Sequence, residues 1–208
     1  MGETYGRQIH TRAKADPFIM DWLHINLAIN EVTGKPISAL WTSSLIETGK
    51  YKTKWHEWCT YEMPGLIEDS TMYEVVPDKS SKILVVDWSS LKVVDVNGNT
   101  IVPHEKMIRS IDNYTIHEHN MKGYKSLVTK IFPIYYLDWR QLVSNGIDIV
   151  QITESAALSA HAPLFCRNDV SDESDRIMNS ILLGMEFWDC ESSVWLNKDA
   201  IADVREFK

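Results

Sequence analysis

The pattern of apolar and polar positions predicts strands along much of the chain. Residues 147–153 (IDIVQIT) alternate apolar and polar side chains, which is typical of a strand with one buried face. Further strands are predicted where Val and Ile dominate, at residues 73–76, 82–87, 93–96 and 100–102. Asn97-Gly98 lies between the last two of these runs and predicts a tight hairpin turn.

Helical spacing occurs in three places between these strands. Trp55, Trp58 and Cys59 fall at i, i+3 and i+4, which predicts one or two helical turns. Longer helices are predicted at residues 136–144 and from residue 174 or 175 to about 183. Each is followed by a glycine, Gly146 or Gly184, that favours a helix end.

The remaining segments carry weaker patterns. Residues 21–29 favour a strand that carries His24, with a short helix as the alternative. Residues 37–45 predict a strand with an apolar first half and a hydroxyl-rich end. Residues 103–130 predict a helix with a loop, and residues 156–172 a loop.

Strands and helices mixed in this way predict an α+β fold. We expect a polar N-terminal lead-in over residues 1–16 and a single domain over residues 17–208, because no repeat or linker interrupts the chain. A central, mostly antiparallel and split sheet flanked by helices is the expected architecture.

Composition narrows the class of protein. A chain of 208 residues can bury one full core or two small ones. Its net charge of −8 argues against sequence-independent binding to nucleic-acid backbones, although a local basic groove remains compatible. No apolar run approaches the length of a membrane span and no secretory signal is recognisable, so we expect a cytoplasmic protein without membrane partners. The three cysteines are widely spaced and favour neither a disulfide framework nor a metal site.

The most unusual stretch is residues 187–197 (FWDCESSVWLN). It is predicted to be a strand with aromatic flanks, yet its middle holds Asp189 and Glu191, which alternation would put on one face. A carboxylate buried beside aromatics is costly unless it is paired or used. Residues 40–44 (LWTSS) combine an indole with hydroxyls and are the candidate to lie opposite. A strand with one solvated face is the alternative.

Familiar catalytic motifs are missing. The sequence has no GxGxxG, P-loop, HExxH or GxSxG. His117 and His119 form a possible metal pair without a third ligand at a suitable spacing, so no metal is expected. Cys190 is expected to be a small buried side chain rather than a nucleophile. Trp55, Trp58 and Trp195 are expected in the core, whereas Trp41 is a candidate to line a pocket because hydroxyls follow it.

Four segments resemble a group of phage and bacterial proteins that carry a KPxGGLWTS-like segment early and a WDCES-like segment late. The segments are residues 35–43 (KPISALWTS), 55–59 (WHEWC), 147–153 (IDIVQIT) and 188–192 (WDCES). The layout also resembles the ADP-ribosyltransferase fold, with an early His or Arg, a middle Ser-Thr-Ser-like strand and a late essential Glu. The sequence departs from these patterns where Ile-Ser-Ala replaces the glycines and where the late motif is Asp-x-Glu.

The resemblance implies an NAD-dependent mono-ADP-ribosyltransferase, a toxin or effector in phage–host conflict, that modifies a protein or nucleic acid. Glu191 would stabilise the positive charge that develops on the ribose, and Asp189 would orient or deprotonate the acceptor. The implied NAD-binding residues are His24, Trp41, Thr42, Ser43, Ser44 and Tyr51. The early position stays open, because Arg7, His10 and Arg12 also precede the hydroxyl strand.

Two other classes of protein remain open. A non-catalytic binding or inhibitor protein on the same fold, such as an antitoxin-type partner, would explain the acidity and the missing glycines. A nuclease would use Asp189 and Glu191 as ligands of a divalent metal. The basic run at residues 50–54 (KYKTK) and the predicted loop at residues 156–172 are candidate contacts for a macromolecular acceptor.

Overall fold

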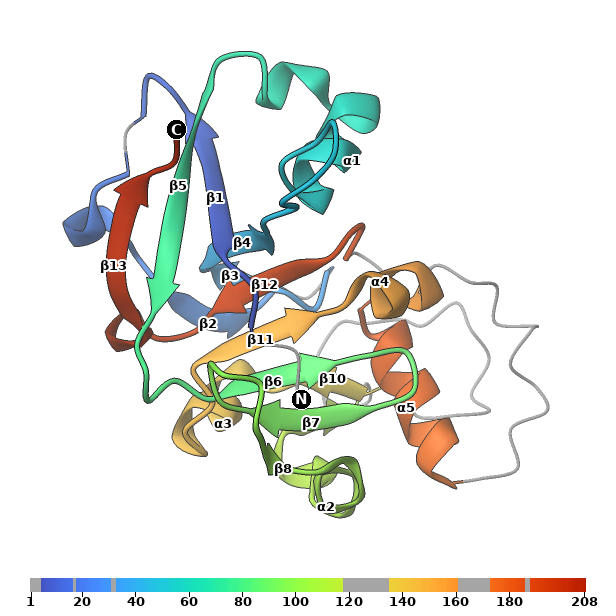
Figure 1. Ribbon diagram of the computed structural model, residues 1–208. Coiled ribbons are helices and arrows are strands. Elements are labelled where there is room, and N and C mark those ends of the chain that lie inside the picture. Colours follow the sequence, from blue (N-terminus) through green and yellow to red (C-terminus); the bar gives the residue numbers. More distant parts are fainter. Residues whose placement is uncertain (1–4, 17, 31–32, 118–134, 161–172, 186–187) are drawn as a thin grey trace.

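A nine-stranded mixed sheet forms the centre of the computed structural model (Figure 1). The structure describes residues 5–16, 18–30, 33–117, 135–160, 173–185 and 188–208. In spatial order the strands are β13 (Ile201–Glu206), β5 (Ser70–Pro77), β1 (Gln8–Ala13), β4 (Leu40–Ser44), β12 (Ser192–Trp195), β11 (Ile149–Ile152), β6 (Ile83–Val86), β7 (Leu91–Val94) and β8 (Thr100–Val102).

Neighbouring strands of this sheet run antiparallel except for β6 and β11, which are parallel. Two smaller antiparallel ladders accompany the sheet. They join β2 (Asn26–Ile29) to β3 (Pro36–Ser38) and β9 (Thr115–His117) to β10 (Tyr135–Leu137). The predicted α+β class and the mostly antiparallel sheet are therefore confirmed.

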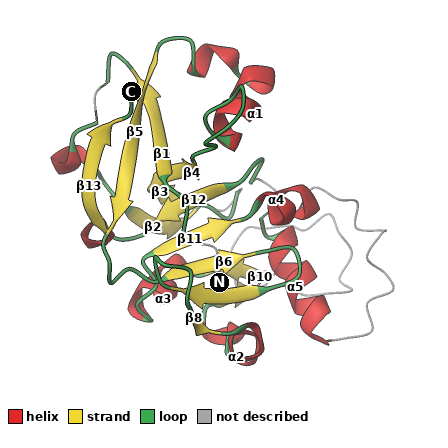
Figure 2. Cartoon of the chain, in the orientation of Figure 1, coloured by secondary structure: helices red, strands yellow, loops and turns green. Residues whose placement is uncertain are grey.

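Helices surround the strands, as the red and yellow segments of Figure 2 show. The five α-helices of the described residues are α1 (Lys54–Glu62), α2 (His104–Arg109), α3 (Trp139–Ser144), α4 (Glu154–Ala160) and α5 (Glu173–Leu183). Single 3-10 turns occupy Met20–Trp22, Pro64–Leu66, Ile111–Asn113 and Lys198–Ala200. Within the described ranges no helix has both the length and the apolar character needed to cross a membrane.

Local sequence signals explain several of these boundaries. The Thr53 side chain accepts a hydrogen bond from the His56 N–H at 2.9 Å and caps α1, and Asp138 caps α3 in the same way. Gly98 has a φ of +79°, as the tight turn between β7 and β8 requires. The predicted hairpin and the helical spacing near Trp55 are thus confirmed.

The inner strands of the sheet are buried on both faces, and their consecutive residues point to opposite sides. On β6, Leu84 and Val86 join a large apolar cluster with residues of the helices, whereas Ile83 joins a smaller cluster on the other face. Val194 and Trp195 divide β12 in the same way. A sheet buried on both sides leaves little room for polar side chains, so those that are buried must have partners.

The structure corrects four local expectations. Residues 8–13, predicted as part of a polar lead-in, form β1 in the interior of the sheet between β5 and β4. The strand predicted at residues 187–197 is shorter, since β12 begins only at Ser192. The helix predicted at residues 136–144 begins at Trp139, because the preceding residues pair with β9. Residues 156–160, predicted as part of a loop, belong to α4, and residues 161–172 lie outside the described residues.

Candidate functional site

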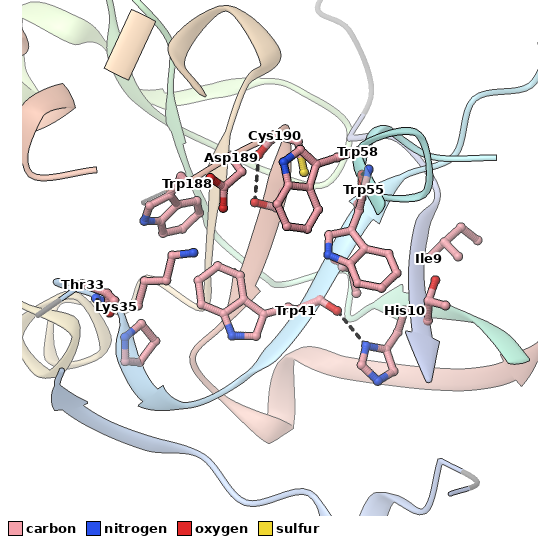
Figure 3. A pocket seen from close by; sticks show the side chains of 15 residues that line it. Ile9, His10, Thr33, Lys35, Trp41, Trp55, Trp58, Trp188, Asp189 and Cys190 are labelled. Carbon is pink, nitrogen blue, oxygen red and sulfur yellow. Dashed lines mark hydrogen bonds between the residues drawn. The ribbon is translucent and has the colours of Figure 1, made fainter. Parts of the chain in front are cut away.

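A cavity of about 440 Å³ lies where β1, β4, α1 and the segment before β12 meet. Figure 3 shows two indoles from α1, Trp55 and Trp58, on one side of it, and Lys35 with Trp188 on the other. Trp41 from β4 lies between them, so four tryptophans contribute to the lining. A volume of this size suits a small organic ligand, and the indole faces suit a planar one.

Contacts beneath the cavity fix its aromatic wall. The rings of Trp41 and Trp188 meet edge to face with centroids 4.9 Å apart, and Trp139 stacks behind Trp188 at 6.3 Å. Trp139 donates from its indole nitrogen to the carbonyl of Gly34 at 3.0 Å. The orientation of Trp188 is thus set by packing from behind, which leaves a rigid surface toward the cavity.

Glu191 lies next to this cavity and is 7% exposed. Its position follows from strand pairing, because Ser193 of β12 lies opposite Thr42 of β4. Ser43 Oγ donates to one carboxylate oxygen at 2.7 Å, and the Ser44 N–H reaches the same oxygen at 2.9 Å. Ser44 Oγ at 2.9 Å and Gln151 Nε2 at 3.3 Å donate to the other oxygen. Four neutral donors therefore hold the carboxylate.

A chain of buried hydrogen bonds supports this arrangement from below. Trp195 Nε1 donates to Thr42 Oγ1 at 2.9 Å, and Thr42 donates to Gln8 Oε1 at 2.7 Å. Gln8 Nε2 then donates to Ser44 Oγ at 3.0 Å. Because Ser44 Oγ accepts from Gln8, its own proton is directed at Glu191. The chain thus orients one of the donors that hold the carboxylate.

His10 on β1 also lines the cavity. Its Nδ1 lies 2.8 Å from the carbonyl oxygen of Trp41 and therefore carries the proton, since a carbonyl can only accept (Figure 3). Burial lowers the pKa of His10, and this outweighs the opposing effect of the Trp41 carbonyl. The imidazole is therefore neutral at pH 7.

The structure brings together most of the residues predicted for the site. Trp41, Thr42 and Ser43 line the cavity, and Ser44 holds Glu191 beside it. Asp189 also lines the cavity, yet it is exposed whereas Glu191 is buried. The two carboxylates do not share a strand face as predicted, because the chain enters β12 only after Glu191.

Two predicted cofactor-binding residues lie elsewhere. His24 is exposed in the connection before β2, where its carbonyl accepts a hydrogen bond from Ser38. His10, one of the alternatives left open, lines the cavity instead. The Tyr51 hydroxyl donates to Tyr61 at 3.1 Å, and Tyr51 does not line the cavity.

The expectation that Trp55 and Trp58 belong to the core is wrong, while Trp195 is fully buried as predicted. The spacing of Trp55 and Trp58 alone could not reveal that they line the cavity, since residues at i and i+3 share a helix face whatever that face contacts. The sequence signal that could have located α1 is Thr53, whose side chain caps the helix and fixes where it begins.

The thiol of Cys190 also lines the cavity. Burial, with the nearby Glu191 and Asp189 carboxylates, raises its pKa to about 12. Burial also raises the pKa of Cys59 to about 11. Both thiols are free and are protonated at pH 7. Without a charge they can pack as small apolar side chains do.

Metal binding finds no support within the described ranges, where no three side chains of His, Cys, Asp or Glu gather as metal ligands would. The side chain of His117 and all of His119 lie outside the described residues.

Comparison with known proteins adds no relative. No protein-family model, no curated protein and no solved structure matches the chain. What the cavity does must therefore be argued from its own residues.

Proposed function

We propose that the cavity binds NAD and that the protein is a mono-ADP-ribosyltransferase. The observation that carries this proposal is the contact between Ser43 Oγ and the Glu191 carboxylate, 2.7 Å long, at the edge of a cavity with four indoles. A hydroxyl strand against a late glutamate is the arrangement that the resemblance to ADP-ribosyltransferases implies. The contact between Ser43 and Glu191 is observed, and NAD as the substrate is our proposal.

The chemistry requires a fixed negative charge near a ribose. When the bond from ribose C1′ to the nicotinamide nitrogen breaks, its electron pair neutralises the pyridinium ring, and positive charge spreads over C1′ and the ring oxygen. A nucleophile of the acceptor then bonds to C1′ and loses its proton. Glu191 would stabilise the intermediate charge, since it is held in place by donors that carry no charge themselves.

Other cavity residues fit supporting roles. The indole of Trp41 offers a planar face to nicotinamide, while Ser43 keeps Glu191 in position. Asp189 is exposed at the cavity and can accept the proton that the acceptor loses. The acceptor would be a macromolecule, either a protein or a nucleic acid.

The shape of the sheet agrees with the finer fold that we propose, an ADP-ribosyltransferase-like split sheet. In Figure 1, β13, β5 and β1 run steeply across the direction of β11, β6 and β7, so the sheet has two differently oriented halves. The cavity lies near the junction, at β4 and the approach to β12. The free thiols of Cys59 and Cys190 suit a reducing cytoplasm, where an effector in phage–host conflict would act.

The test is release of nicotinamide from NAD by the purified protein, alone and with cell lysate, compared with Glu191→Gln. We expect the variant to lose about 10³-fold in rate, as when a group that stabilises transition-state charge is removed. Glu74→Gln, at a buried glutamate that lies opposite Ile9 but does not itself line the cavity, is the matched control and should keep the rate. Equal rates for wild type and Glu191→Gln would refute the proposal.

A second candidate function, a non-catalytic binding protein, has one observation in its favour. The two carboxylate oxygens of Glu191 together already accept four hydrogen bonds, two each. Glu191 is also not among the residues that line the cavity. Such a carboxylate can be structural. A stoichiometric complex with a partner protein, together with no nicotinamide release in lysate, would favour this candidate.

A further inference from the structure

Lys35 presents an ammonium group to the cavity from the turn between β2 and β3. Its Nζ lies 5.3 Å from the ring centroid of Trp41 and 5.9 Å from that of Trp188 (Figure 3). The backbone of this turn is fixed, because the Asn30 N–H donates to the Lys35 carbonyl at 2.8 Å and Thr33 Oγ1 accepts from the Lys35 N–H at 3.3 Å. The backbone that carries this side chain is therefore fixed beside the cavity.

Among the described residues no carboxylate pairs directly with this cation. In the described parts of the chain Lys35 Nζ makes neither an ion pair nor a hydrogen bond. Burial lowers the pKa of Lys35, and the charge of Asp189 only partly opposes this. Two indole faces offset some of the cost of desolvation, yet the donors of the ammonium remain open toward the cavity.

The other lysines near the cavity differ from Lys35. Lys54 is already engaged, with Glu154 at 2.7 Å and Glu57 at 3.2 Å. Lys50 lies over the ring of Tyr51 at 4.9 Å and is exposed, away from the cavity lining. Lys35 alone among these three combines partial burial, aromatic neighbours and a place on the lining.

We propose that Lys35 binds the diphosphate of a nucleotide whose planar ring stacks on the tryptophans of the cavity. A purely apolar ligand would leave the ammonium unpaired, and a small inorganic anion would leave the indole faces uncovered. A nucleoside diphosphate carries both groups, a planar ring and a flexible anion. This inference rests on the proposed function, for which it assigns the residue that holds the NAD diphosphate.

Asp189 shapes the selectivity of this site. It lines the same cavity as Lys35 and its charge lies close enough to raise the pKa of Lys35. A carboxylate repels a phosphate, so Asp189 weakens the binding of anions while it maintains the charge of the ammonium. Replacement of Asp189 by Asn is therefore expected to tighten the binding of a diphosphate, by about twofold to threefold.

The test is calorimetric titration of the full chain with ADP-ribose, which has the ring and the diphosphate but no nicotinamide to release. We expect Lys35→Met to weaken binding by about tenfold, the usual scale of one charge-assisted hydrogen bond. Lys35→Arg keeps the charge and should stay within about threefold of wild type. Lys79→Met, at an exposed lysine remote from the cavity lining, removes the same charge and should change nothing.

The outcomes separate this inference from the proposed function. Equal affinity of wild type and Lys35→Met for ADP-ribose overturns the inference, as does a wild type that does not bind ADP-ribose. The inference is also overturned if Lys35→Met weakens the binding of single-stranded oligonucleotides but not of ADP-ribose. Lys35 would then contact the phosphate of a nucleic-acid acceptor. Lys35-dependent binding of ADP-ribose without nicotinamide release supports the inference and removes the transferase.

Discussion

Two glutamates of this protein are equally buried but held by different groups. Glu74 on β5 is 6% exposed and Glu191 before β12 is 7% exposed. Arg7 and Arg205 bind Glu74 at 2.6 and 2.9 Å. Glu191 accepts hydrogen bonds from hydroxyl, amide and backbone donors, and no cation pairs with it in the described part of the chain. Burial therefore does not explain why arginines hold one glutamate and neutral donors hold the other.

The difference separates a structural carboxylate from a candidate functional one. Arg7 and Arg205 lower the pKa of Glu74 to about 2, and the pair joins the ends of β1 and β13 to β5. Such a clamp uses the charge of the glutamate completely. Within the described residues no arginine takes that role at Glu191, so its charge can act on something else, and its neighbours Cys190 and Ser192 line the aromatic cavity.

The two arrangements begin at adjacent residues. Arg7 reaches Glu74, and Gln8 reaches Glu191 through Ser44. Successive side chains of an extended segment point to opposite faces, so one short stretch serves both glutamates. The N-terminal strand is thus the element on which the comparison between the two sites depends.

The largest difference between the two glutamates is expected when each is shortened by one methylene. Glu191→Asp withdraws the carboxylate from Ser43 and Ser44, and we expect nicotinamide release to fall about 100-fold, since such small displacements are costly in catalysis. Glu74→Asp should stay within twofold, because exposed arginines can follow a carboxylate. Initial rates with NAD at saturation measure both. Similar losses in the two variants would mean that Glu191 acts only through the fold.

A second experiment removes the support beneath Glu191. Gln8 is fully buried and makes hydrogen bonds to Thr42, Ser44 and the Gly6 carbonyl. In Gln8→Leu these groups lose a partner inside the protein, so the free energy of unfolding should fall by about 2 kcal/mol. Urea denaturation measures it. Gln151→Leu, which removes a single bond of 3.3 Å to Glu191, is the control and should cost less.

Local patterns in the sequence predicted the local parts of this fold. The Asn97-Gly98 turn and the strand within residues 147–153 depend on neighbours in the chain, and both are present. The proximity of residues 40–44 to Glu191 was also predictable, because hydroxyls after an indole and a glutamate between tryptophans each need an unusual partner. Buried polar groups point to one another even when far apart in sequence.

The N-terminal strand could not be predicted by the same reasoning. Residues 8–13 (QIHTRA) are mostly polar, and their polarity suggested solvent. Gln8 is buried only because Thr42 and Ser44, more than thirty positions away, satisfy its amide. His24 was preferred to His10, which was left as an alternative, for the same reason, since the place of His10 on the cavity depends on the pairing of β1 with β4. Long-range pairing overrides local pattern here.

A third experiment tests the clamp at Glu74. Because its pKa is lowered on folding, the stabilisation is complete above the unfolded value near 4.5 and is lost as pH falls toward about 2. Glu74→Gln should therefore lower the free energy of unfolding by about 1–2 kcal/mol at pH 7, a figure reduced for solvent around the arginines. The difference from wild type should vanish near pH 2. A difference that persisted there would show that lost packing, not charge, is responsible.

The smallest effect distinguishes the two glutamates by salt. The side chains of Arg7 and Arg205 are 47% and 61% exposed, so ions can approach the clamp at Glu74. At 1 M salt charges are screened within about 3 Å, and the destabilisation caused by Glu74→Gln should shrink by about 0.5 kcal/mol. The cost of Glu191→Gln should not change with salt, because its partners are neutral donors inside the protein. Urea unfolding of both variants at low and high salt measures this. A salt-dependent cost at Glu191 would mean that a cation does balance its charge, and the contrast between the two glutamates would no longer hold.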